Sequence, residues 1–201
     1  MLYRIHFSGD IRKLYKQTMY MSPDSLQGLL NKVLFETILY FCRRGRENIR
    51  ELDSSDFEIK YDADGRKYVT KVKSEQTKNH QGTTNEDESN GGRMYATGSI
   101  MCPVSSFEKY LSKRNSKCSA LFQHPKSSFC NDDNEWYENK PIGKHMLGSF
   151  MANLSTQAKL SEVYTNHCIR ATTITELNRE GFKDRDIIAV SGHRSTTALK
   201  S

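Results

Sequence analysis

The residues best suited to chemistry lie near the C-terminal end of the chain. His167 and Arg170 stand three positions apart at the start of a predicted helix, so their side chains project from one helix face. The free N–H groups and the dipole of a helix N-terminus attract anions, so a phosphate would be well placed there. Gly192-His193-Arg194 follows with a second imidazole. A His-x-x-Arg string on its own also describes a polar helix end beside a surface charge.

Basic residues at two other places could join such a site. Arg43, Arg44 and Arg46 follow the most apolar run of the chain, and Lys78 borders its most polar stretch. Two arginines can hold the non-bridging oxygens of a phosphodiester with planar, charge-assisted pairs, and a lysine can act as a general acid. The alternatives are a solvated helix end, where basic residues are common, and one loop lysine among several.

The composition is typical of one globular domain with an anionic partner. The 201 residues can bury a continuous core, and 30 Lys and Arg against 24 Asp and Glu give a net charge of +6 and a pI near 9.0. The most apolar run, from Leu29 to Cys42, contains Lys32 and Glu36 and is too short to cross a bilayer. We therefore expect an intracellular protein without a membrane partner.

The cysteines predict neither disulfides nor a metal centre. The chain has five, an odd number without paired spacing, which indicates a reducing compartment. Cys102, Cys118, His124 and Cys130 could form a zinc site, but the gaps are long and no close Cys pair anchors them. Buried free thiols are the favoured interpretation. For Trp136-Tyr137, whose neighbours are acidic, we expect packing within a loop.

Hydrophobic periodicity and turn residues predict a mainly helical α+β fold with a small antiparallel hairpin, in a single domain over residues 1–201. Ser22-Pro23 is expected to cap the longest helix, Asp64-Gly65 to form the hairpin turn, and Gly181 and Gly192 to end the last two helices. A low-complexity stretch at about 79–92 is expected to be a mobile polar loop. The predicted helices cover residues 22–43, 106–114, 144–160, 165–178 and 184–190, and the strands cover 57–61 and 67–73.

Three short sequence motifs resemble those of a known family. They are Gly45-Arg46-Glu47-Asn48, Thr77-Lys78-Asn79-His80-Gln81-Gly82, and the run from Tyr164 to Thr172. Together with Gly192-His193, the chain resembles the catalytic domain of tyrosine recombinases (phage integrases). More narrowly, it is similar to the Crypton-derived type found at the C-terminus of MYM-type zinc finger proteins. This resemblance implies a transposon-derived domain of the nucleus that binds double-stranded DNA.

The resemblance also implies roles for individual residues, with no metal ion or cofactor. Two arginines would grip the phosphate, Lys78 would protonate the departing 5′-oxygen, His167 would manage the proton of the attacking hydroxyl, and His193 would donate a hydrogen bond. The distance to Leu52 and the hairpin favours Arg44 over Arg46 as the first arginine, although a slip in alignment would reverse them. The implied catalytic residues are Arg44, Lys78, His167, Arg170 and His193; the implied DNA-binding residues are Arg44, Arg46, Lys78, Arg170, His193 and Arg194.

Two departures from the family pattern qualify this expectation. The nucleophilic tyrosine should follow the second histidine, but the last tyrosine of the chain is Tyr164, which is expected to pack at the helix entrance. We also expect no separate N-terminal core-binding domain. We therefore expect a DNA-binding domain whose strand cleavage and rejoining chemistry is incomplete. The alternatives are a domesticated nuclear protein-interaction or transcription-regulatory module without catalysis, and an active recombinase whose chain was cut short.

Overall fold

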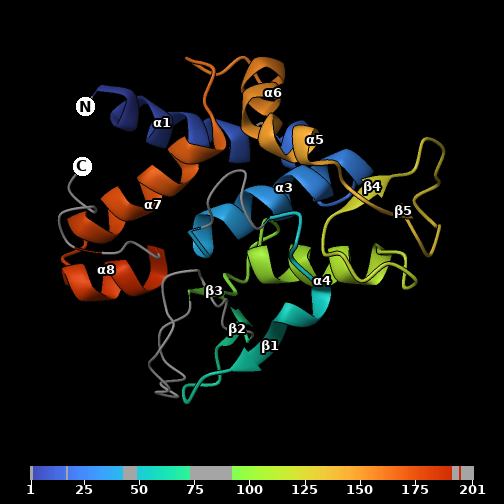
Figure 1. The fold of residues 1–201 in the computed structure, drawn as a ribbon, viewed down its shortest axis with the longest axis horizontal. Helices are drawn as coiled ribbons and strands as arrows, with labels where there is room; N and C mark the ends of the chain where they lie inside the picture. Colours follow the sequence, from blue (N-terminus) through green and yellow to red (C-terminus); the bar gives the residue numbers. More distant parts are fainter. Residues whose placement is uncertain (1, 17, 43–48, 73–91, 192–194, 196–201) are drawn as a thin grey trace.

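The computed structural model describes residues 2–16, 18–42, 49–72, 92–191 and 195 (Figure 1). These residues form a mainly helical α+β fold, as predicted. Within the described residues, no helix is both long and apolar enough to span a membrane. In chain order the elements are α1 (Leu2–Lys16), α2 (Thr18–Met21), α3 (Leu26–Tyr40), η1 (Ser54–Asp56), β1 (Phe57–Tyr61), β2 (Lys67–Lys71), β3 (Arg93–Tyr95), α4 (Pro103–Lys113), β4 (Gln123–Pro125), β5 (Tyr137–Pro141), α5 (Lys144–Gly148), α6 (Phe150–Gln157), α7 (Asn166–Arg179) and α8 (Asp184–Ser191).

Helix α3 forms the centre of the fold and packs against α2, α4 and α7 (Figure 1). Tyr15 of α1 also contacts it, through Phe35 and Glu36. Its start was predicted three residues too early. Ser25 is the N-cap, and its side chain accepts a hydrogen bond from the Gly28 N–H at 3.1 Å. Ser22 instead accepts a hydrogen bond from the Asp24 N–H, in the turn that precedes the helix. Because α3 is apolar on nearly all sides, it is buried along most of its length.

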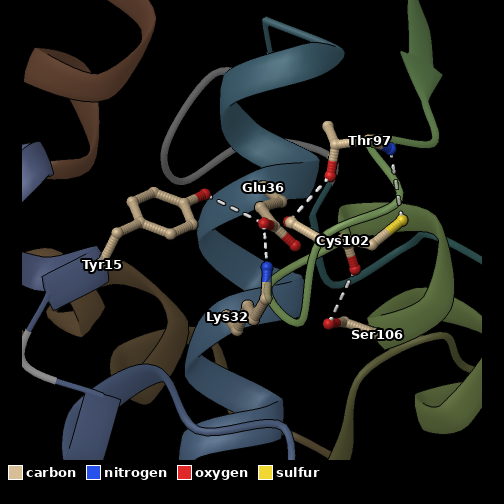
Figure 2. Close-up of polar contacts among 7 residues, drawn as sticks. Tyr15, Lys32, Glu36, Thr97, Cys102 and Ser106 are labelled. Carbon is tan, nitrogen blue, oxygen red and sulfur yellow. Dashed lines mark hydrogen bonds and ion pairs between the residues drawn. The ribbon is translucent and has the colours of Figure 1, made fainter.

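A buried ion pair lies on α3 (Figure 2). Lys32 and Glu36 are one helical turn apart, and both are at most 1% exposed. The Tyr15 hydroxyl of α1 donates a hydrogen bond of 2.9 Å to the same carboxylate oxygen that Lys32 contacts. Burial raises the pKa of Glu36, although Lys32 and Tyr15 oppose the shift. The cluster attaches α1 to the central helix.

The predicted hairpin is confirmed and gains a third strand. β1 pairs antiparallel with β2, and β2 with β3, through the pairs Ile59 with Val69 and Val69 with Met94. Gly65 has a φ of 76° in the connecting turn, which favours glycine. One face of this sheet packs on the core through Phe57, whose ring contacts Phe41 and Phe107. β3 was missed because it has only three residues and follows the polar stretch.

Several other boundaries differ from the prediction. α4 begins at Pro103 rather than Ser106, because proline fits the first helical position. The helix predicted over 144–160 is two helices, which Ser149 separates. Tyr137 lies in β5, not in a loop, and pairs with β4, while Trp136 beside it is only 2% exposed. α1 and α2 were not predicted, because their apolar residues do not form a strong periodic stripe.

Asp10 joins α1 to the segment that leads into α7. Its Oδ2 accepts hydrogen bonds from the Ser161 N–H, the Ser161 hydroxyl and the Tyr164 hydroxyl, at 3.1, 2.5 and 2.8 Å. Tyr164 is 1% exposed, which confirms that it packs at the entrance of α7. Burial by itself would raise the pKa of Asp10, but these hydrogen bonds lower it below its ordinary value of 3.8.

The first prediction concerns Gly28. An added Cβ at Gly28 would lie 2.5 Å from the Ser22 carbonyl oxygen and 2.7 Å from the Ser22 nitrogen, both of them backbone atoms. We expect Gly28→Ala to lower the free energy of unfolding by about 1–3 kcal/mol, measured by urea denaturation. The control is Gly9→Ala, because Gly9 lies in α1 with no atom within 4 Å of its added Cβ. Alanine favours helices, so this control should stabilise by up to about 1 kcal/mol. Equal effects of the two changes would contradict the prediction.

The second prediction concerns pH. Because the pKa of Asp10 is lower in the folded state, its contribution to stability is present above the unfolded value and is lost as pH falls through the folded value. We expect Asp10→Asn to cost about 1–3 kcal/mol at neutral pH and to flatten the fall in stability below about pH 4. Urea denaturation between pH 3 and 7 measures both effects. The exposed Asp132 is the control, and Asp132→Asn should follow the wild-type curve.

Candidate functional site

Two of the predicted site residues, His167 and Arg170, lie among the described residues, and both are on α7. Arg44, Arg46, Lys78, His193 and Arg194 fall outside them, as do residues 79–91 of the loop predicted at about 79–92. Each of these segments has one of the described residues Cys42, Gly92 and Ser191 at one of its ends. Their positions show where each segment meets the body of the fold.

The first turn of α7 is fixed by Asn166 rather than by its cap. Thr165 is the N-cap, but its side chain makes no capping hydrogen bond. The Asn166 side chain accepts from the Met151 N–H at 3.0 Å and donates to the Leu147 carbonyl at 2.8 Å, which holds α7 against α5 and α6. His167 follows directly and is exposed. Its imidazole is therefore accessible at the N-terminal end of the helix, where an anion is favoured.

Arg170 is buried, with only 6% of the residue exposed. Its guanidinium donates a hydrogen bond from Nη2 to the Ser191 carbonyl at the end of α8, while its Nε is buried and has no hydrogen-bond partner among the described residues. Within the part of the chain that the structure describes, no carboxylate forms an ion pair with it. A buried cation that lacks a counter-charge is costly, and an anionic ligand would offset that cost. His167 and Arg170 therefore lie on the same helix, but His167 is exposed to solvent and Arg170 is buried.

The C-terminal end of α3 lies against Arg170. The Cys42 thiol is 3.9 Å from the Arg170 carbonyl oxygen, and the Thr173 hydroxyl donates to the Leu39 carbonyl at 2.8 Å. Cys42 has a φ of 49°, which turns the chain sharply before the segment 43–48. Burial raises the pKa of Cys42, although the positive charge of Arg170 opposes this.

Gly92, which directly precedes β3, packs against the C-terminal end of α3. A Cβ at this position would be 2.3 Å from the Tyr40 carbonyl oxygen, so only glycine allows the backbone to approach α3 this closely. We call Tyr40–Cys42, Gly92, Arg170 and Ser191 the α3–α7 junction. The three segments that carry the other predicted site residues all begin or end at this junction. Sequence reasoning missed Gly92, for which the Gly91-Gly92 pair was the available signal.

A second polar cluster surrounds Cys102, the N-cap residue of α4 (Figure 2). Its sulfur accepts the Thr97 N–H at 3.4 Å, and its carbonyl accepts the Ser106 hydroxyl at 3.0 Å. Burial would raise the pKa of Cys102, but hydrogen bonds from Ser105, Thr97 and Gly98 lower it to about 6. Only 3% of the Cys102 residue is exposed, so its thiol is little accessible to solvent. The cluster therefore fixes the loop between β3 and α4 rather than offering a reactive thiol.

The residues considered for zinc do not share one environment. Cys102 and Cys118 are buried, whereas Cys130 is exposed. His124 contacts the Glu138 carboxylate at 3.5 Å and the Pro125 carbonyl at 3.0 Å. Among the described residues, no three His, Cys, Asp or Glu side chains gather in a way that could hold a metal ion.

Comparison with known proteins identifies a sequence family and a fold. Residues 13–156 match the family described as "Domain of unknown function (DUF3504)", which covers α3, both sheets and most of α6 but ends before α7. No curated protein matches the sequence significantly.

Solved structures of site-specific recombinases and integrases are similar to this chain. The XerH site-specific recombinase, bound to palindromic difH substrate in a post-cleavage complex, matches with a TM-score of 0.54 and 14% identity. The match covers 94% of this chain and 47% of that one. A lambda integrase dimer bound to a COC′ core site matches with a TM-score of 0.50 and 14% identity, over 94% of this chain and 44% of that one. The chain thus spans less than half the length of these recombinases. It belongs to the DUF3504 family and has the fold of the tyrosine recombinase catalytic domain.

Proposed function

We propose that this chain is a DNA-binding domain of the tyrosine recombinase type, in which Arg170 contacts a backbone phosphate of duplex DNA. The observation that carries the proposal is the buried Arg170 guanidinium, which has no carboxylate partner among the described residues. Its position at the α3–α7 junction adds support, because every other predicted phosphate-binding residue lies on a segment that adjoins this junction. The similar XerH and lambda integrase structures hold DNA, and the net charge of +6 favours the same class of partner.

The chemistry proposed for the site is phosphodiester binding with an incomplete cleavage apparatus. Arg44 and Arg170 would hold the non-bridging oxygens, and His193 would donate a further hydrogen bond. In cleavage, a tyrosine oxygen would bond to phosphorus as the bond to the 5′-oxygen breaks. His167 would accept the tyrosine proton, and Lys78 would protonate the departing oxygen. The 201 residues contain no tyrosine after Tyr164, which is buried, so we propose that they bind DNA without completing this step alone.

We further propose that the domain descends from a Crypton-type mobile element, adjoins MYM-type zinc fingers and acts in the nucleus. The three sequence motifs that resemble this group support the proposal. A nuclear protein-interaction module with the same fold is the contrasting outcome, because fold does not determine function. Duplex binding distinguishes the two.

The third prediction tests Arg170. We expect Arg170→Ala to weaken duplex binding at low salt roughly tenfold or more and to reduce the slope of log affinity against log salt by about one. Arg170→Lys keeps the charge but loses the planar pairing, so it should retain the slope while binding more weakly. Fluorescence anisotropy with a labelled duplex from 25 to 200 mM salt, roughly the range where phosphate contacts dominate, measures both quantities.

The control is Arg179→Ala on the same helix. Arg179 is exposed and pairs with Glu176 at 3.1 Å, so its loss should leave both quantities near wild type. Circular dichroism checks that each variant is folded. If folded Arg170→Ala kept the wild-type affinity and slope, the junction would not be a phosphate site.

A further inference from the structure

The outer face of the three-stranded sheet, turned away from the core, carries a ladder of aromatic and basic side chains. In the register of the sheet, Tyr68 of β2 stands opposite Tyr95 of β3, and their rings are 5.2 Å apart. The Arg93 guanidinium lies 4.9 Å from the centre of the Tyr68 ring, and Arg66 lies 5.1 Å from that of Tyr95. Tyr68 is only 7% exposed, although it lies on the face opposite to the core residues Val69 and Met94.

Aromatic side chains hold Arg93 in place, and it forms no ion pair with a carboxylate among the described residues. The Tyr68 ring supports its guanidinium from one side, and Nη1 donates a hydrogen bond of 3.4 Å to the Tyr95 hydroxyl. Both partners are uncharged phenols. The residue is exposed, so its remaining N–H groups face solvent in a fixed orientation. A cation fixed in this way loses less conformational entropy when it binds an anion.

Three other basic side chains of β1, β2 and the turn between them have carboxylate partners. Lys60 pairs with Glu58 at 3.2 Å, Arg66 with Asp62 at 2.9 Å, and Lys67 with a carboxylate of α4 at 2.5 Å. Among the described residues, Arg93 forms no such pair. Its charge is therefore more available to an external anion than the charges of Lys60, Arg66 and Lys67.

The position of Arg93 suggests which anion it binds. It follows Gly92 directly, and Gly92 abuts Tyr40 at the α3–α7 junction. Figure 1 shows β3 next to the end of α3, at the edge of the sheet nearest to α8. A DNA duplex carries one negative charge per about 1.7 Å of its axis, so a duplex seated at the junction presents further phosphates to the adjoining surface.

We propose that Arg93 binds a backbone phosphate of the same duplex, so that the outer face of the sheet extends the DNA-binding surface beyond the junction. This inference rests on the proposed function. Arg93 makes its contact as a positioned charge, with Tyr68 and Tyr95 as the residues that position it. The contact carries no base specificity, because it is made to the backbone alone.

The test compares Arg93→Gln with the matched control Arg66→Gln. Glutamine keeps a planar end that can lie on the tyrosine ring but removes the charge. We expect Arg93→Gln to reduce the salt slope of duplex binding by about one, equally for unrelated DNA sequences. Arg66 also stacks on a tyrosine but is paired with Asp62, so Arg66→Gln should leave the slope unchanged. Arg93→Lys, which keeps the charge, should also retain the wild-type slope.

The outcomes separate this inference from the proposed function. If Arg170→Ala lowers the slope and folded Arg93→Gln does not, the inference is overturned and the junction stands. If Arg93→Gln lowers the slope and Arg170→Ala does not, the duplex lies on the sheet and the proposed junction site fails. A wild-type chain that binds no duplex at low salt overturns both. A slope reduced equally by Arg93→Gln and Arg93→Lys would show a structural effect and would also overturn the inference.

Discussion

The burial of α3 on nearly all sides is the constraint on which the rest of the structure depends. A helix without a polar face must be covered by other elements, and here α2, α4 and α7 cover it. Even its charged pair, Lys32 and Glu36, is enclosed and shared with α1 through Tyr15. A buried pair of this kind adds little net stability but is very costly to break. Its effect is to favour one docking of α1 over others.

The position of the candidate site follows from where this helix ends. The helix ends at Tyr40, and its last carbonyl groups need partners. The Phe41 N–H bonds back to Thr37, the Thr173 hydroxyl of α7 satisfies Leu39, and Gly92 packs directly on Tyr40. The sheet and α7 are thus drawn to the same helix end. Arg170 is buried beside it as a consequence of this packing.

Charge is used differently at the two candidate phosphate contacts. Arg170 lies in a nearly closed environment, where an unpaired cation is expensive and its attraction for an anion is correspondingly strong. Arg93 stands in solvent, where screening weakens each interaction and aromatic support supplies the orientation instead. The DUF3504 match over residues 13–156 includes the sheet and Arg93 but ends before α7. The central helix, the sheets and Arg93 therefore lie within the matched family region, whereas Arg170 lies outside it.

The sequence by itself determined the features that local chemistry controls. The apolar run of α3, the Asp64-Gly65 turn, and the helices α7 and α8 were all recognisable, because periodicity and turn residues act over a few positions. The resemblance supplied His167 and Arg170 as a pair on one helix. It also supplied five residues that the structure does not describe, so their roles remain predictions.

Only the tertiary structure decided where those local features would be used. Ser25 rather than Ser22 caps α3 because Ser22 is held in the preceding turn, and β3 forms because β2 offers it an edge to pair with. The three-residue spacing of His167 and Arg170 gave no indication that one is exposed and the other buried. That difference depends on contacts that form only in the folded chain. Cys42, after the end of α3, and Ser191 of α8 both contact Arg170. The burial of Arg170 and the approach of Gly92 to Tyr40 both depend on contacts between residues that are far apart in the sequence. A local sequence pattern does not predict such contacts.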